Sequence, residues 1–141
     1  MKSVSAVIIL VIFGYCSFAQ NNWMLNANMD IIKTDINSVF DKGQMSIEAN
    51  YFVKQKLSFG LGYEYRTEED DYFALNSRYH ILSFVLIRAR VLLNDEKIDF
   101  SIAPGYQYFL SRRWRIEVFP EFYFNEPEFA LRFGVAYVFT N

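Results

Sequence analysis

Few residues of this chain have the types and spacing that catalysis requires. His80 is its single histidine, and Ser83 follows three positions later. Residues an odd number apart on a strand point to opposite faces, so local spacing does not make these two a nucleophile and its base. We therefore expect His80 to be an ordinary polar residue at a strand end.

The carboxylates offer no better case for catalysis or metal binding. Glu117 and Glu121 would share one strand face at about 13 Å, wider than the roughly 5–9.5 Å that separates the carboxyl groups of glycosidases. The acidic run 68–71 lacks the spacing of a calcium loop. The sequence has no Cys/His cluster or glycine-rich phosphate loop. These observations predict a non-enzymatic protein without cofactor or metal.

An alternation of large apolar residues with polar or small ones organises the chain instead. It predicts an all-β antiparallel meander without helices. The expected strands are 23–31, 45–53, 57–66, 79–93, 98–108, 114–124 and 129–139. The polar stretch 67–78 is expected to form a loop, with a turn at 76–78. Residues 72–76 are a short candidate for an eighth strand.

Loop lengths support hairpins between these strands, because paired residues must face the same side of a sheet. Three-residue loops would pair Val53 with Leu57 and Leu110 with Trp114. Across each of the four-residue connections 94–97 and 125–128, the apolar residues change between odd-numbered and even-numbered positions. A loop with an even number of residues requires this change if paired residues are to face the same side.

Two prolines interrupt the expected ladders. Pro104 and Pro120 fall in the middle of strands on the apolar face. Proline cannot donate a main-chain hydrogen bond, so we expect β-bulges at both positions.

The polar face is rich in arginine and nearly balanced in charge. Its charged members are Asp30, Glu48, Glu64, Arg66, Arg88, Arg90, Asp99, Arg115, Glu117, Glu121 and Arg132. Arginine can offset part of its desolvation by bidentate pairing with a carboxylate, whereas a solvated outer face would more often carry lysine. We therefore expect these side chains to fill the lumen of a barrel whose apolar face meets lipid.

The first residues indicate export. Lys2, the apolar run 4–13 and the sequence Ser17-Phe18-Ala19 have the features of a cleaved signal peptide. This divides the chain into a signal peptide, 1–19, and one barrel domain, 20–141. A membrane anchor or a lipid attached to Cys16 is the alternative for this segment.

Charge gives no sign of a nucleic-acid partner. Loss of Lys2 with the signal peptide leaves 13 of the 14 basic residues against 16 acidic ones, a net charge of −3 spread along the chain. No basic patch is visible in the sequence. Cys16 is the single cysteine, so disulfides are not expected in the mature chain.

The last strand carries a family resemblance. Every second residue from 129 to 139 is large and apolar, in the order Phe, Leu, Phe, Val, Tyr, Phe. This pattern resembles the closing strand of the small outer-membrane β-barrel family of Gram-negative bacteria, although Thr140 and Asn141 follow the final aromatic. The resemblance implies an eight-stranded transmembrane barrel in the outer membrane, where it contacts lipid. It also implies recognition by the barrel-assembly machinery, through Phe133, Tyr137 and Phe139.

The leading hypothesis is thus a non-enzymatic integral outer-membrane barrel with a structural role or a role in binding through its loops to an unidentified extracellular ligand. One alternative is a soluble secreted barrel that binds a small apolar ligand, with Met45, Ile47, Phe59 and Leu61 lining its interior. Another is an outer-membrane lipid-modifying enzyme, which would need a surface-facing nucleophile and base. Seven strands would leave the last strand pointing away from the periplasm, whereas the family uses an even number.

Overall fold

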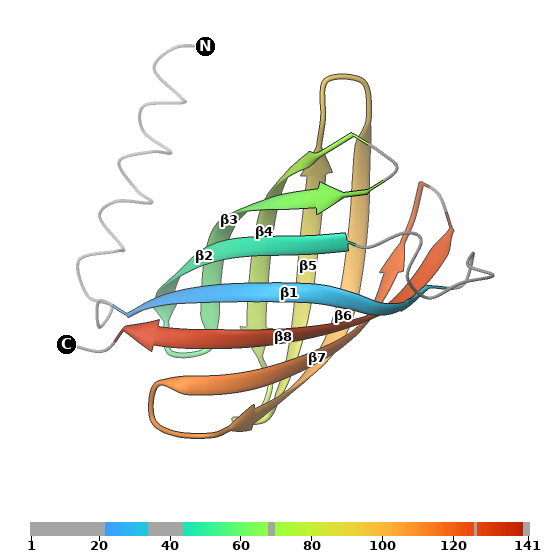
Figure 1. Ribbon diagram of the computed structural model, residues 1–141. Helices are drawn as coiled ribbons and strands as arrows, with labels where there is room; N and C mark the ends of the chain where they lie inside the picture. The colour runs from blue at the N-terminus through green and yellow to red at the C-terminus, as the bar shows by residue number, and fades with distance from the viewer. Residues whose placement is uncertain (1–21, 34–43, 68–69, 126, 140–141) are drawn as a thin grey trace, which may run out of the picture.

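A computed structural model describes residues 22–33, 44–67, 70–125 and 127–139. These residues form a closed barrel in which each strand pairs antiparallel with the next, and β1 pairs with β8 (Figure 1). The strands are β1 (Trp23–Lys33), β2 (Gln44–Lys54), β3 (Leu57–Arg66), β4 (Tyr72–His80), β5 (Val85–Leu93), β6 (Ile98–Phe109), β7 (Trp114–Tyr123) and β8 (Glu128–Phe139). The predicted antiparallel up-and-down barrel of eight strands is confirmed. Within the described ranges, no helix is long and apolar enough to span a membrane.

The eighth strand is β4, most of which lies in the stretch 67–78 that is predicted to form a loop. The expected strand 79–93 is interrupted by a turn in which the main-chain N–H groups of Ile81 and Leu82 donate to the carbonyl of Val85, at 3.0 and 3.1 Å. The expected turn at 76–78 lies inside β4. The prediction failed because residues 81–84 include no Gly, Pro or Asn and three of the four are apolar, so the sequence does not mark a break between two strands there. With eight strands, Trp23 pairs with Phe139 and both strand ends lie at one end of the barrel.

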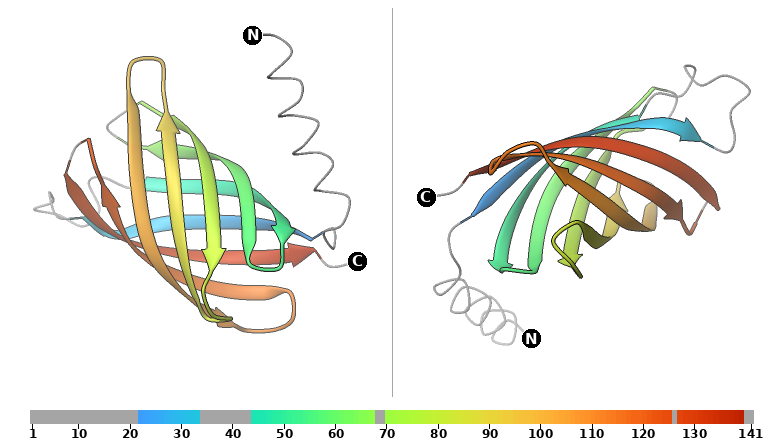
Figure 2. Two further views of the ribbon diagram at one scale, coloured as in Figure 1. Left: turned by 180° about the vertical axis from the view of Figure 1, so that it is seen from behind. Right: turned by 90° about the horizontal axis from the view of Figure 1, so that it is seen from below.

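The apolar side chains point outward along the whole barrel, and Figure 2 shows the ribbon of that barrel from behind and from below. Met45, Ile47, Phe59 and Leu61 have exposed fractions of 57, 62, 51 and 54%. These are the residues that a soluble ligand-binding barrel would bury. Their exposure contradicts that alternative, because lipid is the solvent that an extended apolar outer surface requires.

The hairpins follow the predicted parity with two local corrections. Leu93 pairs with Ile98, and the N–H of Leu110 donates to the carbonyl of Trp114, as expected. At the β2–β3 hairpin, however, Leu57 pairs with Lys54 and the register shifts between Phe52 and Lys54. The expected pair of Val53 with Leu57 is therefore wrong.

The second correction concerns the connection between β7 and β8. Tyr123 pairs with Glu128, so this connection spans 124–127 rather than 125–128. The apolar side chains nevertheless keep their outward direction, because the register moves by an even number of residues.

The two prolines create a gap in the β6–β7 ladder rather than bulges. The pairs Ile102–Phe122 and Tyr106–Val118 flank the gap and share one register, which places Pro104 directly opposite Pro120. The N–H of Phe124 donates to the carbonyl of Phe100, so even-numbered residues of both strands direct their main-chain groups at each other. Each proline therefore lacks the N–H that would reach the carbonyl of the other.

Replacing one proline tests the gap in the ladder. Pro120→Ala introduces an N–H opposite the carbonyl of Pro104, and we expect its free energy of unfolding to be about 1 kcal/mol higher than that of Pro127→Ala, measured by urea titration in detergent micelles. Pro127→Ala, in the β7–β8 connection, is the matched control. It should give no gain, since it adds freedom to the unfolded chain without completing a ladder. Equal effects of the two substitutions would contradict the proposed gap.

Candidate functional site

The candidate site is the lumen, into which every strand directs at least one charged side chain. Ten of the eleven charges expected there are at most 9% exposed: Asp30, Glu48, Glu64, Arg66, Arg88, Arg90, Asp99, Glu117, Glu121 and Arg132. Arg115 is half-buried. The strand pleat explains this arrangement, since alternate residues point inward along every strand. The inward positions are even-numbered in β1–β5 and β8 and odd-numbered in β6 and β7.

Arg90 on β5 joins three other strands. Its Nε donates to Glu121 on β7 at 2.7 Å, and its Nη1 reaches Glu64 on β3 at 2.7 Å and Glu48 on β2 at 3.3 Å. Its Nη2 also donates to the hydroxyl of Tyr123 at 3.2 Å. The guanidinium thus crosses the interior and satisfies several carboxylates at once, which offsets part of the cost of removing these charges from water.

Arg132 on β8 forms a second centre at the seam that closes the barrel. It lies directly opposite Asp30 in the β1–β8 register, and its Nε donates to Asp30 at 2.5 Å. Its Nη1 donates to Glu64 at 2.9 Å, so Arg132 and Arg90 share that carboxylate. The first and last strands are therefore linked by an ion pair as well as by main-chain hydrogen bonds.

Arg78 belongs to the same network, although the sequence analysis placed it in a loop. Its Nη1 contacts both carboxylate oxygens of Glu117, at 3.0 and 2.9 Å, and its Nη2 donates to Glu48 at 2.8 Å. A signal for it existed. Apolar side chains at Phe73, Leu75 and Tyr79 alternate with inward residues through Arg78, but the acidic stretch before them obscured the pattern.

Arg88 completes the centre of the lumen beside an aromatic ring. Its Nη2 donates to Glu121 at 2.9 Å, and its guanidinium carbon lies 3.9 Å from the ring centre of Phe119, a cation–π distance. A Cβ atom at Gly105 would come within 2.3 Å of this ring. Glycine at position 105 therefore leaves the space that Phe119 occupies.

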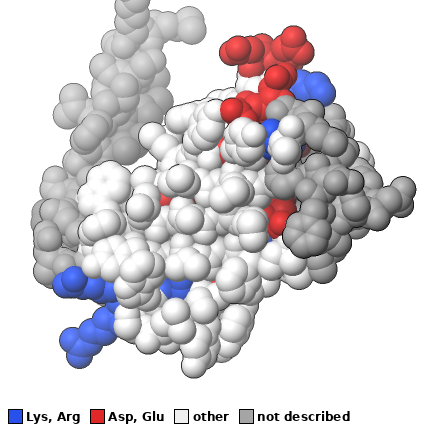
Figure 3. Space-filling model, viewed as in Figure 1, with Lys and Arg blue, Asp and Glu red and all other residues white. Residues whose placement is uncertain are grey.

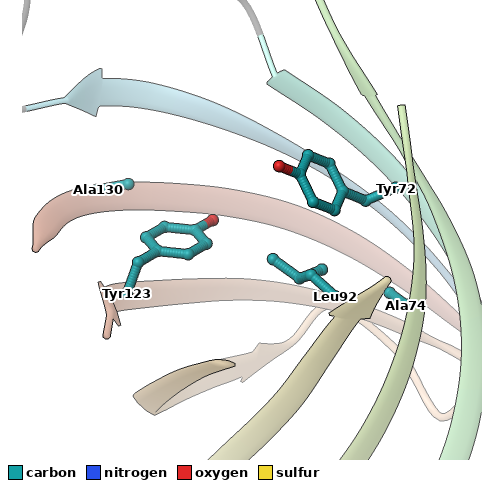
Figure 4. Close-up of a cluster of buried hydrophobic side chains, with 5 residues drawn as sticks. All are labelled: Tyr72, Ala74, Leu92, Tyr123 and Ala130. Atoms are coloured by element: carbon teal, nitrogen blue, oxygen red, sulfur yellow. The ribbon is translucent and has the colours of Figure 1, made fainter. Parts of the chain in front are cut away.

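Apolar side chains close the lumen at both ends. Tyr72, Ala74, Leu92, Tyr123 and Ala130 cluster where β4, β7 and β8 meet their loops (Figure 4). A second cluster, near the first residue of β1 and the last of β8, contains Met24, Phe52, Ala136 and Val138. The ion pairs between these two layers are shielded from water, which strengthens their mutual attraction.

Two of the expected lumen charges have other roles. Asp99 accepts hydrogen bonds from the main-chain N–H of Asn125 at 3.1 Å and of Phe100 at 2.7 Å, which positions the β7–β8 connection. Arg115 donates to the side chain of Gln107 at 3.4 Å and lies over the ring of Phe109. These side chains lie toward opposite ends of the lumen, away from the central ion pairs.

The residues weighed as catalytic candidates lie apart or are engaged in ion pairs. His80 is buried with its ring 5.6 Å from that of Phe52, whereas Ser83 lies in the exposed β4–β5 turn. Glu117 binds Arg78, and Glu121 binds Arg88 and Arg90. No group of three or more His, Cys, Asp or Glu side chains suited to a metal is found among the described residues. Glu68 and Glu69 lie outside those residues.

Solved structures with the same architecture are membrane barrels. A de novo designed transmembrane β-barrel matches with a TM-score of 0.67 at 18% identity, over 84% of this chain and 96% of the other. The N-terminal β-barrel domain of Pseudomonas aeruginosa OprF matches with a TM-score of 0.60 at 13% identity, over 85 and 98%. A second designed barrel, TMB2.3, gives 0.62 at 16% identity, over 86 and 96%. No protein-family model and no curated protein matches the sequence.

The geometry of the barrel and its similarity to solved membrane barrels together define the fold class. The chain is a closed eight-stranded antiparallel barrel of the transmembrane type, with its apolar face outside and its charges inside. Because the sequence identities are low, the likeness applies to the fold.

Removing one central arginine tests the role of the network. Arg90→Leu leaves Glu64 and Glu121 short of a counter-charge in a shielded interior, so we expect a loss of about 3–5 kcal/mol in the free energy of unfolding. Arg112→Leu, in the exposed β6–β7 turn, should change it by less than about 0.5 kcal/mol. Urea unfolding in the same detergent measures both. A loss at Arg90 no larger than that at Arg112 would show that the network contributes little.

Proposed function

We propose that this protein is a non-enzymatic integral outer-membrane barrel with a structural role or a role in binding through its loops. The observation that carries the proposal is the division of the two faces. Large apolar side chains cover the outside, and paired charges fill the inside. The proposal includes export with residues 1–19 as a cleaved signal peptide, a segment outside the described residues.

Aromatic side chains support a membrane setting. Trp23 packs against Tyr51 with ring centres 5.0 Å apart, and Trp114 packs edge-on against Tyr137 at 4.9 Å. These residues lie near the strand ends at the end of the barrel where β1 begins and β8 finishes. Tyr and Trp gather at this depth in membrane barrels because their rings are apolar and their polar groups prefer the headgroup region.

The filled lumen argues against a channel. An eight-stranded barrel has an interior just wide enough for side chains, and here Arg78, Arg90 and Arg132 cross it to carboxylates on other strands. Passage of an ion would require several of these buried pairs to separate together. The barrel is therefore proposed to anchor its loops in the membrane without conducting.

Location and conductance test this proposal together. We expect the protein in the outer-membrane fraction, with folded and heat-denatured forms that migrate differently on a denaturing gel. The purified barrel in a planar lipid bilayer should produce no discrete conductance steps. Recovery from the soluble periplasm would contradict the membrane assignment, and regular conductance steps would contradict the sealed lumen.

We further propose that the last strand is the segment recognised by the barrel-assembly machinery, through Phe133, Tyr137 and Phe139. Phe139 is 51% exposed at the end of β8, and Tyr137 and Phe139 pack edge-on with ring centres 4.8 Å apart. Their exposed edges are available to a receptor before the barrel meets lipid.

The assembly role predicts a difference between folding in cells and folding in a test tube. Phe139→Ala should lower the outer-membrane level several-fold while the purified chain still folds into detergent micelles. Phe129→Ala, an exposed aromatic at the other end of the same strand, is the control and should leave the level closer to wild type. Quantitative immunoblots of membrane fractions measure both. Equal losses at the two positions would point to strand stability rather than recognition.

A further inference from the structure

The two rims of the barrel carry opposite charge. We call the end formed by the turns 54–57, 81–84 and 110–113 the terminal rim, since β1 begins and β8 ends there. Its turns carry Lys54, Lys56, Arg112 and Arg113, all exposed, and none of their residues is acidic. The described connections of the opposite rim carry Asp70, Asp71, Asp95 and Glu96, with Lys97. Figure 3 shows blue atoms gathered at one end and mainly red atoms at the other.

The terminal rim also places cations beside interfacial aromatics. The Nη1 of Arg113 donates to the hydroxyl of Tyr137 at 3.2 Å, and Tyr137 packs against both Trp114 and Phe139. Aromatic belts mark the boundary between hydrocarbon and headgroups. A guanidinium bonded to the polar end of such a ring therefore lies at the depth of the lipid phosphates.

The turn 81–84 of this rim indicates lipid rather than a soluble partner. Ile81, Leu82 and Phe84 are 42, 52 and 44% exposed at its surface. The strands that carry this turn have nine residues each, near the minimum of about nine that spans a bilayer. The turn therefore stays close to the hydrocarbon boundary, where lipid covers its apolar side chains. A rim held at that depth presents its cations to headgroups.

We propose that the terminal rim binds anionic phospholipid headgroups, with Lys54, Lys56, Arg112 and Arg113 contacting the phosphates. Basic residues next to a membrane surface attract anionic lipids within a Debye length, and salt weakens the attraction. The inference rests on the proposed membrane function and adds a lipid class to it. The acidic opposite rim would repel the same lipids, so the selection is confined to one leaflet.

Tryptophan fluorescence can test this directly, because both tryptophans of the chain, Trp23 and Trp114, begin strands at the terminal rim. The barrel is placed in nanodiscs of mixed phosphatidylcholine and phosphatidylglycerol, with brominated chains on one lipid or on the other. If the rim gathers the anionic lipid, brominated phosphatidylglycerol will quench more than its bulk share. Concentrated salt should remove the excess.

Variants assign the effect to the rim. Neutralising all four cations, as Lys54→Gln, Lys56→Gln, Arg112→Gln and Arg113→Gln, should reduce the excess quenching to the bulk ratio. Lys97→Gln on the acidic rim is the matched control for the single change Lys56→Gln and should leave the excess intact. The substituted positions are exposed in turns or at a strand end, and the heat-dependent gel shift verifies that each barrel is folded.

Three outcomes overturn the inference, and they distinguish its failure from the failure of the proposed function. Lipid selection would be refuted if the folded wild-type barrel were quenched in the bulk ratio of the two lipids. It would also be refuted if the variant with all four substitutions kept the excess quenching by phosphatidylglycerol. Either result would leave the membrane function intact. A chain that does not insert into the nanodiscs would refute both proposals together.

Discussion

The pairing of buried charges inside the barrel is the constraint on which the rest of this structure depends. A charge removed from water is costly unless it meets a counter-charge with good geometry. Here Glu48, Glu64 and Glu121 each contact at least two arginines. The outer surface is apolar, and lipid would solvate it in much the same way whichever strands are paired. The contacts that favour one strand pairing over another must therefore come from the interior.

This constraint links strands that are distant in sequence. Arg132 and Asp30 are separated by 102 positions and meet at the β1–β8 seam, and Arg90 joins β5 to β2, β3 and β7. A one-residue register slip in any of these strands would move the charges to the apolar face and separate them from their partners. The network therefore favours both closure and a single register.

The barrel departs from regular strands and ordinary polar turns mainly at two places: a gap in the backbone hydrogen bonds of one ladder, and a turn without the usual turn residues. Pro104 and Pro120 face each other without a donor between them, yet the register continues on both sides. The β4–β5 turn is built from Ile81, Leu82, Ser83 and Phe84, which carry no turn signal. Its apolar side chains are compatible with a turn at the membrane boundary, where an ordinary polar turn is not required.

The amino-acid pattern alone predicts the class of fold, the outward apolar face and most of the charges of the interior. These follow from alternation, a local property of every extended strand. The number of strands is evident only in the tertiary structure. The turn between β4 and β5 is apolar in sequence and is recognised only by its main-chain hydrogen bonds. It also decided the partners of each charge, including Arg78 with Glu117. Those partners depend on how the sheet staggers and closes, and residues far apart in the chain set that geometry together.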